Sequence, residues 1–412
     1  MVVTGMGTLT PLGNDVPTFW SRLVAGESGV RRIETFDPSR VTSQIAGEVR
    51  DFDPSTVLDR KEIRRNDRYT QFILVATREA MTQAGLPERL EGELADRTGA
   101  IIGSGLGGSG TLIEQISTNA TRGPDRLSPF FIPMAIANMG SGQAAITFGA
   151  RGPNYATVSA CATAGHAIGE AAETIIRGDA EVMLAGGSEA PVYEAIVGAF
   201  AAMRALSTRN DDPAGASRPF DQGRDGFVIA EGAGVLVLEE LRHAEERGAR
   251  ILAELVGYGA TADASHITLP APGGMGGVRA GQRALAKGGV APDEVDHVSA
   301  HATATPEGDP AELAAFHTLF GDHAPQVSIT ATKGAIGHTL GAAGGIGSIA
   351  AICAMREGCV PPTLNLTEPA PELGDLDGTP LTVRPREMRV ALVNAFGFGG
   401  QNSALLFRRW DS

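Results

Sequence analysis

Two apolar patterns alternate along this chain of 412 residues. Short apolar runs bounded by turn residues predict buried strands, and apolar residues at helical spacing predict helices. The predicted strands are residues 2–4, 100–103, 157–159, 181–185, 234–238, 252–257, 295–300, 326–329, 390–394 and 404–407. The predicted helices include residues 16–25, 67–84, 162–177, 241–247, 277–288 and 309–320. Because strands and helices alternate, we expect an α/β fold with buried, largely parallel strands.

The chain is long enough for one large domain or two intimate halves. A division near residue 250 gives an N-terminal half, 1–250, and a C-terminal half, 251–412, each ending in strand-rich segments. No repeat is visible by identity. Each half nevertheless has a small-residue turn after a predicted strand, VSACATAG (158–165) and VNAFGFGGQN (393–402), which suggests a weak internal parallel.

Composition excludes several classes of function. The net charge of −14 argues against nucleic acid as the main partner. The cysteines are Cys161, Cys353 and Cys359; they form no CxxC pair, and their odd number suits a reducing cytoplasm. The start of the chain has no basic leader, and the longest apolar run, 341–355, is too short and glycine-rich to span a membrane. We therefore expect a soluble, cytoplasmic protein.

One cysteine lies where a predicted strand, 155–158, turns into a predicted helix, 162–177. At a helix start, the dipole and the free N–H groups favour the thiolate of Cys161, which is the nucleophilic form. The same N–H groups can hold the oxyanion of an attacked carbonyl. Buried packing is the alternative for a single cysteine, and it is how we interpret Cys353 in its apolar segment.

The C-terminal half adds further polar residues beside small-residue turns. His301 ends a predicted strand, and Glu312 lies in the first turn of the helix that follows. Lys333 and His338 share a glycine-rich turn. Either histidine alone could be a satisfied core residue, but the four side chains together indicate a constructed site. The glycines of 393–402 flank two phenylalanines, which could form a mobile plug or only a tight turn.

These motifs resemble the β-ketoacyl-acyl carrier protein synthase family, most closely the elongating type II condensing enzymes of fatty acid synthesis. The resemblance covers essentially the whole chain, from VVTGMGTLTPLG through GSGLGG, ACATAGHAIG, AHATATPEGD and KGAIGHTLGAAGG to NAFGFGGQN. GSGLGG alone is a weak signal, whereas cysteine, histidine and histidine in this order with these flanks are specific. The resemblance implies a thiolase fold, in which two similar halves form a five-layer αβαβα sandwich, usually in a dimer.

The resemblance also implies a mechanism. Cys161 would accept an acyl group from the phosphopantetheine of an acyl carrier protein, with the N–H groups of Cys161 and Phe398 as the oxyanion hole. His301 and His338 would bind the thioester oxygen of malonyl carrier protein as carbon dioxide leaves, and a 3-oxoacyl product two carbons longer would form. No metal or organic cofactor on this chain is implied. The orienting residues would be Lys333 paired with Glu312, and Asp309 in support.

Further positions follow from the same resemblance. The substrate-binding set is Thr303, Thr305, Thr268, Leu106, Phe131, Phe200, Phe396 and Gly399; its apolar members could equally be ordinary core. Because carrier proteins are acidic and this chain is acidic too, docking needs a local basic patch. The candidates for it are Lys61, Arg64, Arg65, Arg68, Arg126 and Arg204, for which a solvated surface is the alternative.

The chain departs from the family pattern at several places. Ala302 stands where glycine is usual. Ser299, Gly347 and Val393 replace asparagine, glutamate and serine, which with a later asparagine, matching Asn402, form a polar or cation site in many members. Since glycine and valine offer no ligand atom, we expect no bound ion there. The joint change suggests a divergent branch.

Three hypotheses remain distinct. The first is an elongating 3-oxoacyl synthase of fatty acid or reducing type II polyketide synthesis, as a homodimer or paired with an inactive chain-length-controlling homologue. The second is that inactive partner itself, which would lack the cysteine that this chain has. The third is a Cys–His hydrolase, in which a second histidine and a lysine have no role. The sequence does not decide between the fatty acid and polyketide pathways.

Overall fold

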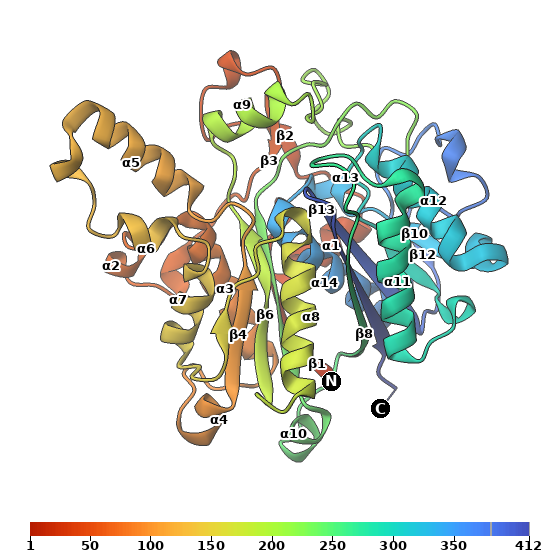
Figure 1. Ribbon diagram of the computed structural model, residues 1–412, viewed down its shortest axis with the longest axis horizontal. Coiled ribbons are helices and arrows are strands. Elements are labelled where there is room, and N and C mark those ends of the chain that lie inside the picture. The colour runs from red at the N-terminus through yellow and green to blue at the C-terminus, as the bar shows by residue number, and fades with distance from the viewer. Residues whose placement is uncertain (380, 412) are drawn as a thin grey trace.

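The computed structural model describes residues 1–379 and 381–411, and its centre is a ten-stranded mixed sheet (Figure 1). Two five-strand sets meet where β1 pairs with β8. The first set, read outward from that pair, is β1 (Val2–Leu9), β7 (Gly232–Glu239), β6 (Val182–Glu189), β4 (Thr98–Gly103) and β5 (Asn154–Tyr155). The second set is β8 (Ala253–Ala262), β14 (Gln401–Arg409), β13 (Val390–Gly397), β9 (His297–Ser299) and β10 (Ser328–Thr330).

The two sets have the same topology. In each, the strands nearest the β1–β8 pair are antiparallel and the outer ones are parallel. The expectation of largely parallel strands is therefore wrong. The reason is that β7 runs back beside β6, and β14 runs back beside β13, so that each of these pairs is antiparallel.

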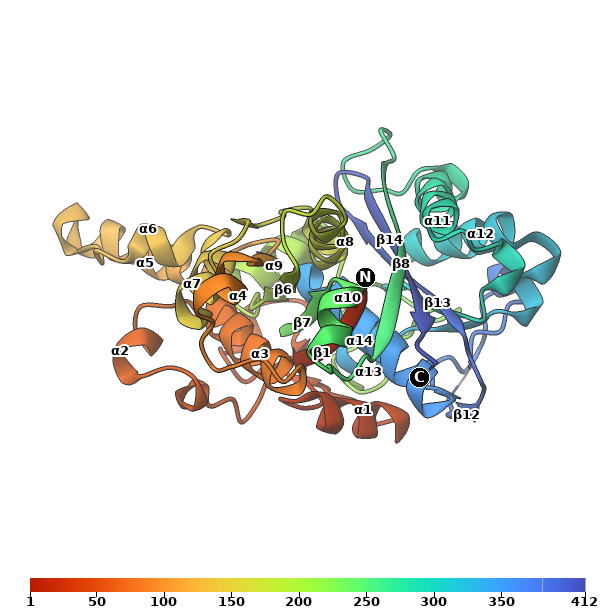
Figure 2. The ribbon, with the colours of Figure 1, turned by 90° about the horizontal axis from the view of Figure 1, so that it is seen from below.

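Helices cover both sets and fill the space between them, which gives five layers (Figures 1 and 2). α3 (Arg68–Gln83) packs on the outside of β1 and β7, and α11 (Met275–Gly288) packs on the outside of β8 and β14. Between the sets lie α8 (Thr163–Ile176) and α14 (Ala343–Glu357), which contact each other. α12 (Gly308–Phe320) packs beside α11.

Shorter elements complete the chain. The remaining helices are α1 (Val16–Val24), α2 (Arg60–Ile63), α4 (Gly92–Asp96), α5 (Ser109–Arg122), α6 (Phe131–Ala135), α7 (Met139–Phe148), α9 (Glu194–Ala202), α10 (Leu241–Glu246) and α13 (Lys333–Ile336). The small strands are β2 (Val30–Arg32), β3 (Ile45–Gly47), β11 (Cys359–Val360) and β12 (Arg384–Pro385). Within the described ranges, no helix is both long and apolar enough to cross a membrane.

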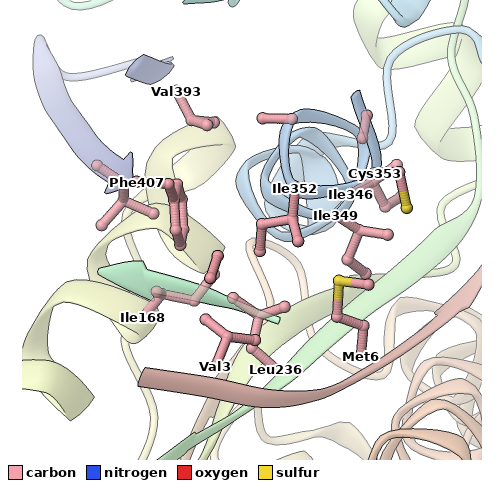
Figure 3. Close-up of a cluster of buried hydrophobic side chains, with 14 of the residues drawn as sticks. Val3, Met6, Ile168, Leu236, Ile346, Ile349, Ile352, Cys353, Val393 and Phe407 are labelled. Carbon is pink, nitrogen blue, oxygen red and sulfur yellow. The ribbon is translucent and has the colours of Figure 1, made fainter. Parts of the chain in front are cut away.

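The central layer owes its tight packing to small residues. A Cβ at Gly344 would lie 2.7 Å from the backbone nitrogen of Gly165, and a Cβ at Gly165 would lie 2.1 Å from Ser403 Oγ. Isoleucines of α8 and α14 fill the rest of this core together with Phe407 (Figure 3). Cys353 is buried in the same cluster, so its interpretation as a packing residue is confirmed.

The sequence parallel between VSACATAG and VNAFGFGGQN is wrong. VSACATAG ends in a 3₁₀ turn, Ala160–Ala162, that leads into α8, whereas VNAFGFGGQN forms the β13–β14 hairpin. The matching turn in the second half is Leu340–Ala342, which leads into α14. The predicted strand before Cys161 is also too long, because β5 ends at Tyr155.

The three departures from the family pattern do face one another. A Cβ at Gly347 would lie 3.2 Å from Ser299 Oγ and 3.4 Å from Val393 Cγ1. Asn402, which we expected in the same group, is bonded elsewhere: its Nδ2 donates to Asp263 Oδ1 at 2.9 Å. The space behind β9 and β13 is therefore occupied by Val393 and the Ser299 hydroxyl.

Gly347→Glu should lower the free energy of unfolding by at least ~3 kcal/mol, because it buries a carboxylate without a cationic partner. Gly347→Ala is the matched control and should change stability little, since its Cβ makes only tight van der Waals contacts. Thermal melts of both variants, in sodium and in potassium buffers, test this. A higher melting temperature for the glutamate variant, or a potassium-specific gain, would mean that a cation fits this place.

Candidate active site

A cavity of about 450 Å³ lies at the junction of the two strand sets. Its wall includes Cys161 from the first half of the chain and His301, His338 and Phe398 from the second. The sequence motifs are therefore brought together from turns that are far apart in the chain. Within the described residues, no three His, Cys, Asp or Glu side chains gather as metal ligands.

Cys161 is held in a turn with an unusual backbone. The preceding residue, Ala160, has φ 49°, and Cys161 lies in the 3₁₀ turn two residues before α8 begins. The backbone N–H groups of Cys161 and Phe398 both act to lower the pKa of its thiol. Gly397 makes this approach possible, since a Cβ there would lie 2.5 Å from the Ser159 carbonyl oxygen.

The thiol is neutral at rest, contrary to the expectation of a thiolate. Burial raises the pKa of Cys161 to about 12, although Lys333 and the two N–H groups act in the opposite direction. The side chain is only 8% exposed. The helix dipole is thus outweighed by the loss of water around the sulfur.

His338 points a ring nitrogen at the thiol. Its Nε2 lies 3.1 Å from Cys161 Sγ, and its Nδ1 accepts the N–H of Leu340 at 3.2 Å. Because Nδ1 acts as an acceptor, the neutral ring carries its hydrogen on Nε2, aimed at the cavity. Burial and the charge of Lys333 hold the pKa of His338 well below its usual value, so the ring stays neutral at pH 7.

His301 stands edge-on to His338, with ring centroids 5.4 Å apart. Phe396 packs against its other side at 5.5 Å. Burial, Lys333 and His338 together hold the pKa of His301 well below its usual value. The ring nitrogen Nδ1 is buried and has no hydrogen-bond partner within the described residues. The site therefore presents two neutral imidazoles on one wall.

Glu312 and Lys333 do not form the ion pair that we expected. Glu312 instead accepts the backbone N–H groups of His301 at 2.8 Å and Ala302 at 2.6 Å, and no salt bridge joins it to Lys333 in the described part of the chain. Burial raises the pKa of Glu312 and lowers that of Lys333. Asp309 accepts the N–H groups of Ala304 and Phe220. The two carboxylates thus shape the loop that carries His301.

Most of the expected substrate-binding residues line the cavity. These are Thr303, Thr305, Thr268, Leu106, Phe200 and Phe396. The hydroxyls of Thr303 and Thr305 are 3.0 Å apart. Phe131 and Gly399 are not in the wall: Phe131 is half-buried on α6, and Gly399 donates its N–H to the Ile267 carbonyl at the β13–β14 turn.

The basic set is only partly a free surface. Lys61, Arg64, Arg65 and Arg126 are exposed, and Arg204 lies in the cavity wall. Arg68 differs, because its guanidinium is bound to the buried carboxylate of Glu231 at 2.9 Å. That charge is already neutralised inside the protein.

Among the residues of the cavity wall that sequence analysis did not name is Glu189, at the end of β6. Its carboxylate is fully buried and accepts the N–H of Gly341, in the turn that follows His338. The signal was an acidic residue in the small-residue segment GGSEA directly after a buried strand.

Comparison with known proteins gives a consistent assignment. Residues 1–244 match the model of the beta-ketoacyl synthase N-terminal domain, and residues 252–367 match that of the C-terminal domain. The chain is 46% identical to 3-oxoacyl-[acyl-carrier-protein] synthase 2 of Coxiella burnetii, over 99% of this chain and 98% of that protein. It is 46% identical to the Staphylococcus aureus protein of the same name, over 100% of this chain and 99% of that protein.

Solved structures agree in fold. A beta-ketoacyl synthase from Burkholderia phymatum has a TM-score of 0.92 at 34% identity, covering 100% of this chain and 99% of that one. A type II polyketide ketosynthase in complex with its acyl carrier protein has a TM-score of 0.90 at 33% identity, with coverage of 100% and 99%. The ishigamide ketosynthase/chain length factor has a TM-score of 0.92 at 32% identity, with the same coverage. The expected thiolase fold is confirmed, and the chain belongs to the beta-ketoacyl synthase family.

Proposed function

We propose that this protein is a 3-oxoacyl-[acyl-carrier-protein] synthase that condenses malonyl carrier protein with an acyl group held on Cys161. The observation that carries the proposal is a buried thiol beside two neutral imidazoles in one cavity. The names of its 46% identical relatives support it. Incubation with malonyl carrier protein and a series of acyl carrier proteins, followed by mass spectrometry of the products, tests it.

In the first step, the Cys161 sulfur attacks the thioester carbonyl of the acyl carrier. The N–H groups of Cys161 and Phe398, which both act on the Cys161 sulfur, would bind the oxygen as it becomes negative. The bond from the carbonyl carbon to the pantetheine sulfur breaks, and the proton of the Cys161 thiol ends on that departing sulfur. The result is an acyl-enzyme and a free carrier.

In the second step, the two imidazoles act on malonyl carrier protein. His301 and His338 each donate an N–H to its thioester oxygen, which gains charge as the bond to the carboxylate carbon breaks. Carbon dioxide leaves, and the resulting enolate carbon attacks the acyl–Cys161 carbonyl. The carbon–sulfur bond to Cys161 breaks, the departing Cys161 thiolate takes up one proton from solvent, and the 3-oxoacyl carrier departs. Lys333, Glu312 and Asp309 position the histidines. No step requires a metal or an organic cofactor on this chain.

The substrate reaches Cys161 along the rest of the cavity. Thr303, Thr305 and Thr268 would bind the pantetheine arm, and the apolar wall at Leu106 and Phe200 would receive the acyl chain. Phe396 would move with the loop that contains Gly399, and Phe131 would act only in the assembled dimer. The acidic carrier would dock on Lys61, Arg64, Arg65, Arg126 and Arg204, with Arg68 bracing that surface through Glu231.

We further propose a cytoplasmic dimer whose subunits each divide near residue 250. Exposed apolar side chains lie on α5, α6 and the edge strand β5, where a second subunit would cover them. They are Leu112, Ile116, Ile132 and Tyr155. α5 and α6 extend away from the body of the molecule at that side (Figures 1 and 2).

The second candidate is a polyketide ketosynthase paired with a chain length factor. Two solved structures that this chain resembles at 32–33% identity are a type II polyketide ketosynthase with its carrier and a ketosynthase/chain length factor. The changed residues Ser299, Gly347 and Val393 fit such a divergent role. Purification from the native host distinguishes the two, since a homologous second chain would co-elute only in the heterodimer.

Substitutions at the nucleophile and at the histidines should separate the two half-reactions. Cys161→Ser should abolish acyl-enzyme formation, while Cys161→Gln should still permit malonyl decarboxylation. His301→Ala or His338→Ala should lower decarboxylation by roughly 10²–10³-fold and spare part of the acyl transfer, because each removes one oxyanion donor. Radiolabelled acyl transfer and carbon dioxide release measure the steps separately.

The control for these variants is His317→Ala, on the outer side of α12 and 39% exposed, which should leave both rates unchanged. Equal loss of the two steps in the His338 variant would show instead that His338 acts as the base for the thiol. Full condensation by Cys161→Ala would refute the mechanism.

The depressed pKa values of the histidines predict the pH profile. In Cys161→Gln, protonation of the histidines should not lower decarboxylation as the pH falls from 8 through the ordinary histidine pKa of ~6.5, since both folded-state values lie well below it. Lys333→Met should move the acid limb to higher pH, because the charge of Lys333 lowers both values. Rates across pH 4–8 test this; an acid limb at the ordinary histidine pKa in the Cys161→Gln enzyme would contradict it.

The same shifts bear on stability. Below the unfolded-state histidine pKa of ~6.5, the unfolded chain binds protons on these two histidines, whereas the folded protein does not. Stability is therefore lost as the pH falls from ~6.5 toward the lower folded-state pKa values. Melting temperatures of His338→Ala should fall less steeply with acid than those of the unsubstituted protein.

Leu106→Phe should favour shorter acyl primers by bulk alone and leave malonyl decarboxylation nearly unchanged. Leu106 is in the cavity wall and 40% exposed. Leu381→Phe, at another exposed leucine outside the cavity, is the control. Competition among primers of different length, read by mass spectrometry, gives the profile; an unchanged profile would remove Leu106 from the acyl pocket.

A further inference from the structure

The register of the sheet matches the two halves residue by residue. β1 skips one residue opposite β7 between Val3 and Gly5, and β8 skips one opposite β14 between Leu255 and Gly257. Val3 and Leu255 each come directly before the skipped residue, and they pair with Leu238 of β7 and Phe407 of β14. Leu238 and Phe407 are therefore equivalent positions.

The next strand in each half continues the match. Leu238 pairs with Met183, and Phe407 pairs with Ala391. Six residues beyond each of these come Glu189 (183 + 6) and Gly397 (391 + 6), at the ends of β6 and β13. Glu189 and Gly397 are therefore equivalent positions.

The turns that these two residues face are equivalent as well. Ala160–Ala162 and Leu340–Ala342 are both 3₁₀ turns, and each begins with a residue in the left-handed region: φ is 49° at Ala160 and 44° at Leu340. Each turn leads into a central helix. Gly341 is thus the counterpart of Cys161.

The two equivalent N–H groups have different neighbours. At the nucleophile, Gly397 has no side chain and leaves the N–H of Cys161 open; a Cβ at 397 would lie 3.3 Å from that nitrogen. At the counterpart, the carboxylate of Glu189 occupies the corresponding place: its Oε2 accepts the N–H of Gly341 at 3.0 Å. The fold therefore contains a duplicate of the oxyanion hole that is filled by a side chain.

Each oxygen of the Glu189 carboxylate accepts two hydrogen bonds. Oε2 also accepts the N–H of Gly105 at 2.8 Å, and Oε1 accepts the N–H of Leu106 at 3.0 Å and the hydroxyl of Ser104 at 2.7 Å. Burial raises the pKa of Glu189, and its four donors act in the opposite direction. Each carboxylate oxygen meets two donors, which an acceptor-only carboxylate satisfies. No cationic side chain pairs with it in the described ranges.

Glu189 joins two parts of the cavity wall. Through Gly105 and Leu106 it holds the loop that carries the Leu106 side chain. Through Gly341 it holds the turn whose Leu340 N–H fixes the tautomer of His338. Displacement of the Leu106 loop or of the Leu340–Ala342 turn would therefore change both the cavity wall at Leu106 and the direction of the His338 Nε2–H.

We propose that Glu189 is a positioning residue, an internal anion in the duplicated oxyanion hole that locks the Leu106 loop to the His338 turn. The proposal rests on the proposed condensing function for its kinetic consequences, but not for its anion-binding ones. A carboxylate that only stabilised the fold would influence neither the primer profile nor the ratio of the two half-reactions.

The isosteric variant Glu189→Gln tests the charge. It keeps the volume of the side chain but replaces one acceptor oxygen by an NH₂ group, which faces the N–H donors around it. Malonyl decarboxylation should therefore fall at least roughly tenfold more than acyl transfer to Cys161, because the N–H of His338 would be displaced. The primer profile should broaden or shift. Glu79→Gln is the matched control: Glu79 is a half-buried glutamate that also accepts two N–H groups, from Thr8 and Val16, away from the cavity. It should lower the melting temperature alone.

The truncated variant Glu189→Ala tests the anion. It leaves the four donors facing an empty space of the size of a carboxylate, which formate can enter. Formate should raise the melting temperature of this variant, and should restore its decarboxylation rate and primer profile. Formamide, which is neutral and of similar shape, and potassium chloride at equal ionic strength should do neither, and formate should not affect the unsubstituted protein.

Several outcomes would contradict the proposal. Unchanged half-reaction ratio and primer profile in a folded Glu189→Gln, or no formate effect on a folded Glu189→Ala, would overturn the proposal. If both variants fail to fold, Ser104→Ala, which removes one donor to Oε1, must shift the primer profile or the proposal is wrong. If the unsubstituted protein forms no 3-oxoacyl product, the proposed function fails, while the formate-dependent melting of Glu189→Ala still tests the internal anion.

Discussion

The contact between α8 and α14 fixes the geometry on which the rest of the molecule depends. Their backbones approach so closely that a Cβ at Gly344 would lie 2.7 Å from the nitrogen of Gly165. Each helix follows directly from a 3₁₀ turn at the cavity, so this contact sets the position of Cys161 relative to Leu340 and His338. The strands pack on the apolar faces of these two helices, and the outer helices cover the other faces of the strands.

Burial determines the charge states in the cavity more strongly than any single partner. It raises the pKa of the Cys161 thiol and lowers those of His301, His338 and Lys333, in each case favouring the neutral form. Neutral imidazoles can donate a hydrogen bond to an oxygen that becomes negative without first losing a proton. The buried cavity therefore suits the proposed decarboxylation, in which the neighbouring backbone N–H groups would compensate for the poor ionisation of the thiol.

The two halves use one topology for different purposes. The nucleophile turn carries a cysteine and faces a glycine, Gly397, whereas its counterpart carries Gly341 and faces a glutamate, Glu189. Of the two equivalent backbone N–H groups, that of Cys161 thus faces a glycine, and that of Gly341 is bonded by a carboxylate of the protein. The two halves thus differ at two pairs of equivalent positions: Cys161 corresponds to Gly341, and Gly397 corresponds to Glu189.

The sequence predicted much of the fold, because apolar spacing reports directly on which side of a strand or helix is buried. Every strand of the central sheet except β5 was located, and so were α3, α8, α11 and α12, with ends within a few residues. Strand direction was not accessible in this way, since a buried antiparallel strand such as β13 has the same apolar pattern as a parallel one.

For the site, the sequence supplied the residue types and their flanks, and so identified Cys161, His301 and His338 as a group. Only the tertiary structure showed that Glu312 bonds backbone N–H groups rather than Lys333, that the thiol is protonated, and that Glu189 lies in the cavity wall. The physical reason is that hydrogen-bond partners and desolvation depend on distances between segments remote in the chain, whereas local sequence patterns record only what each segment buries.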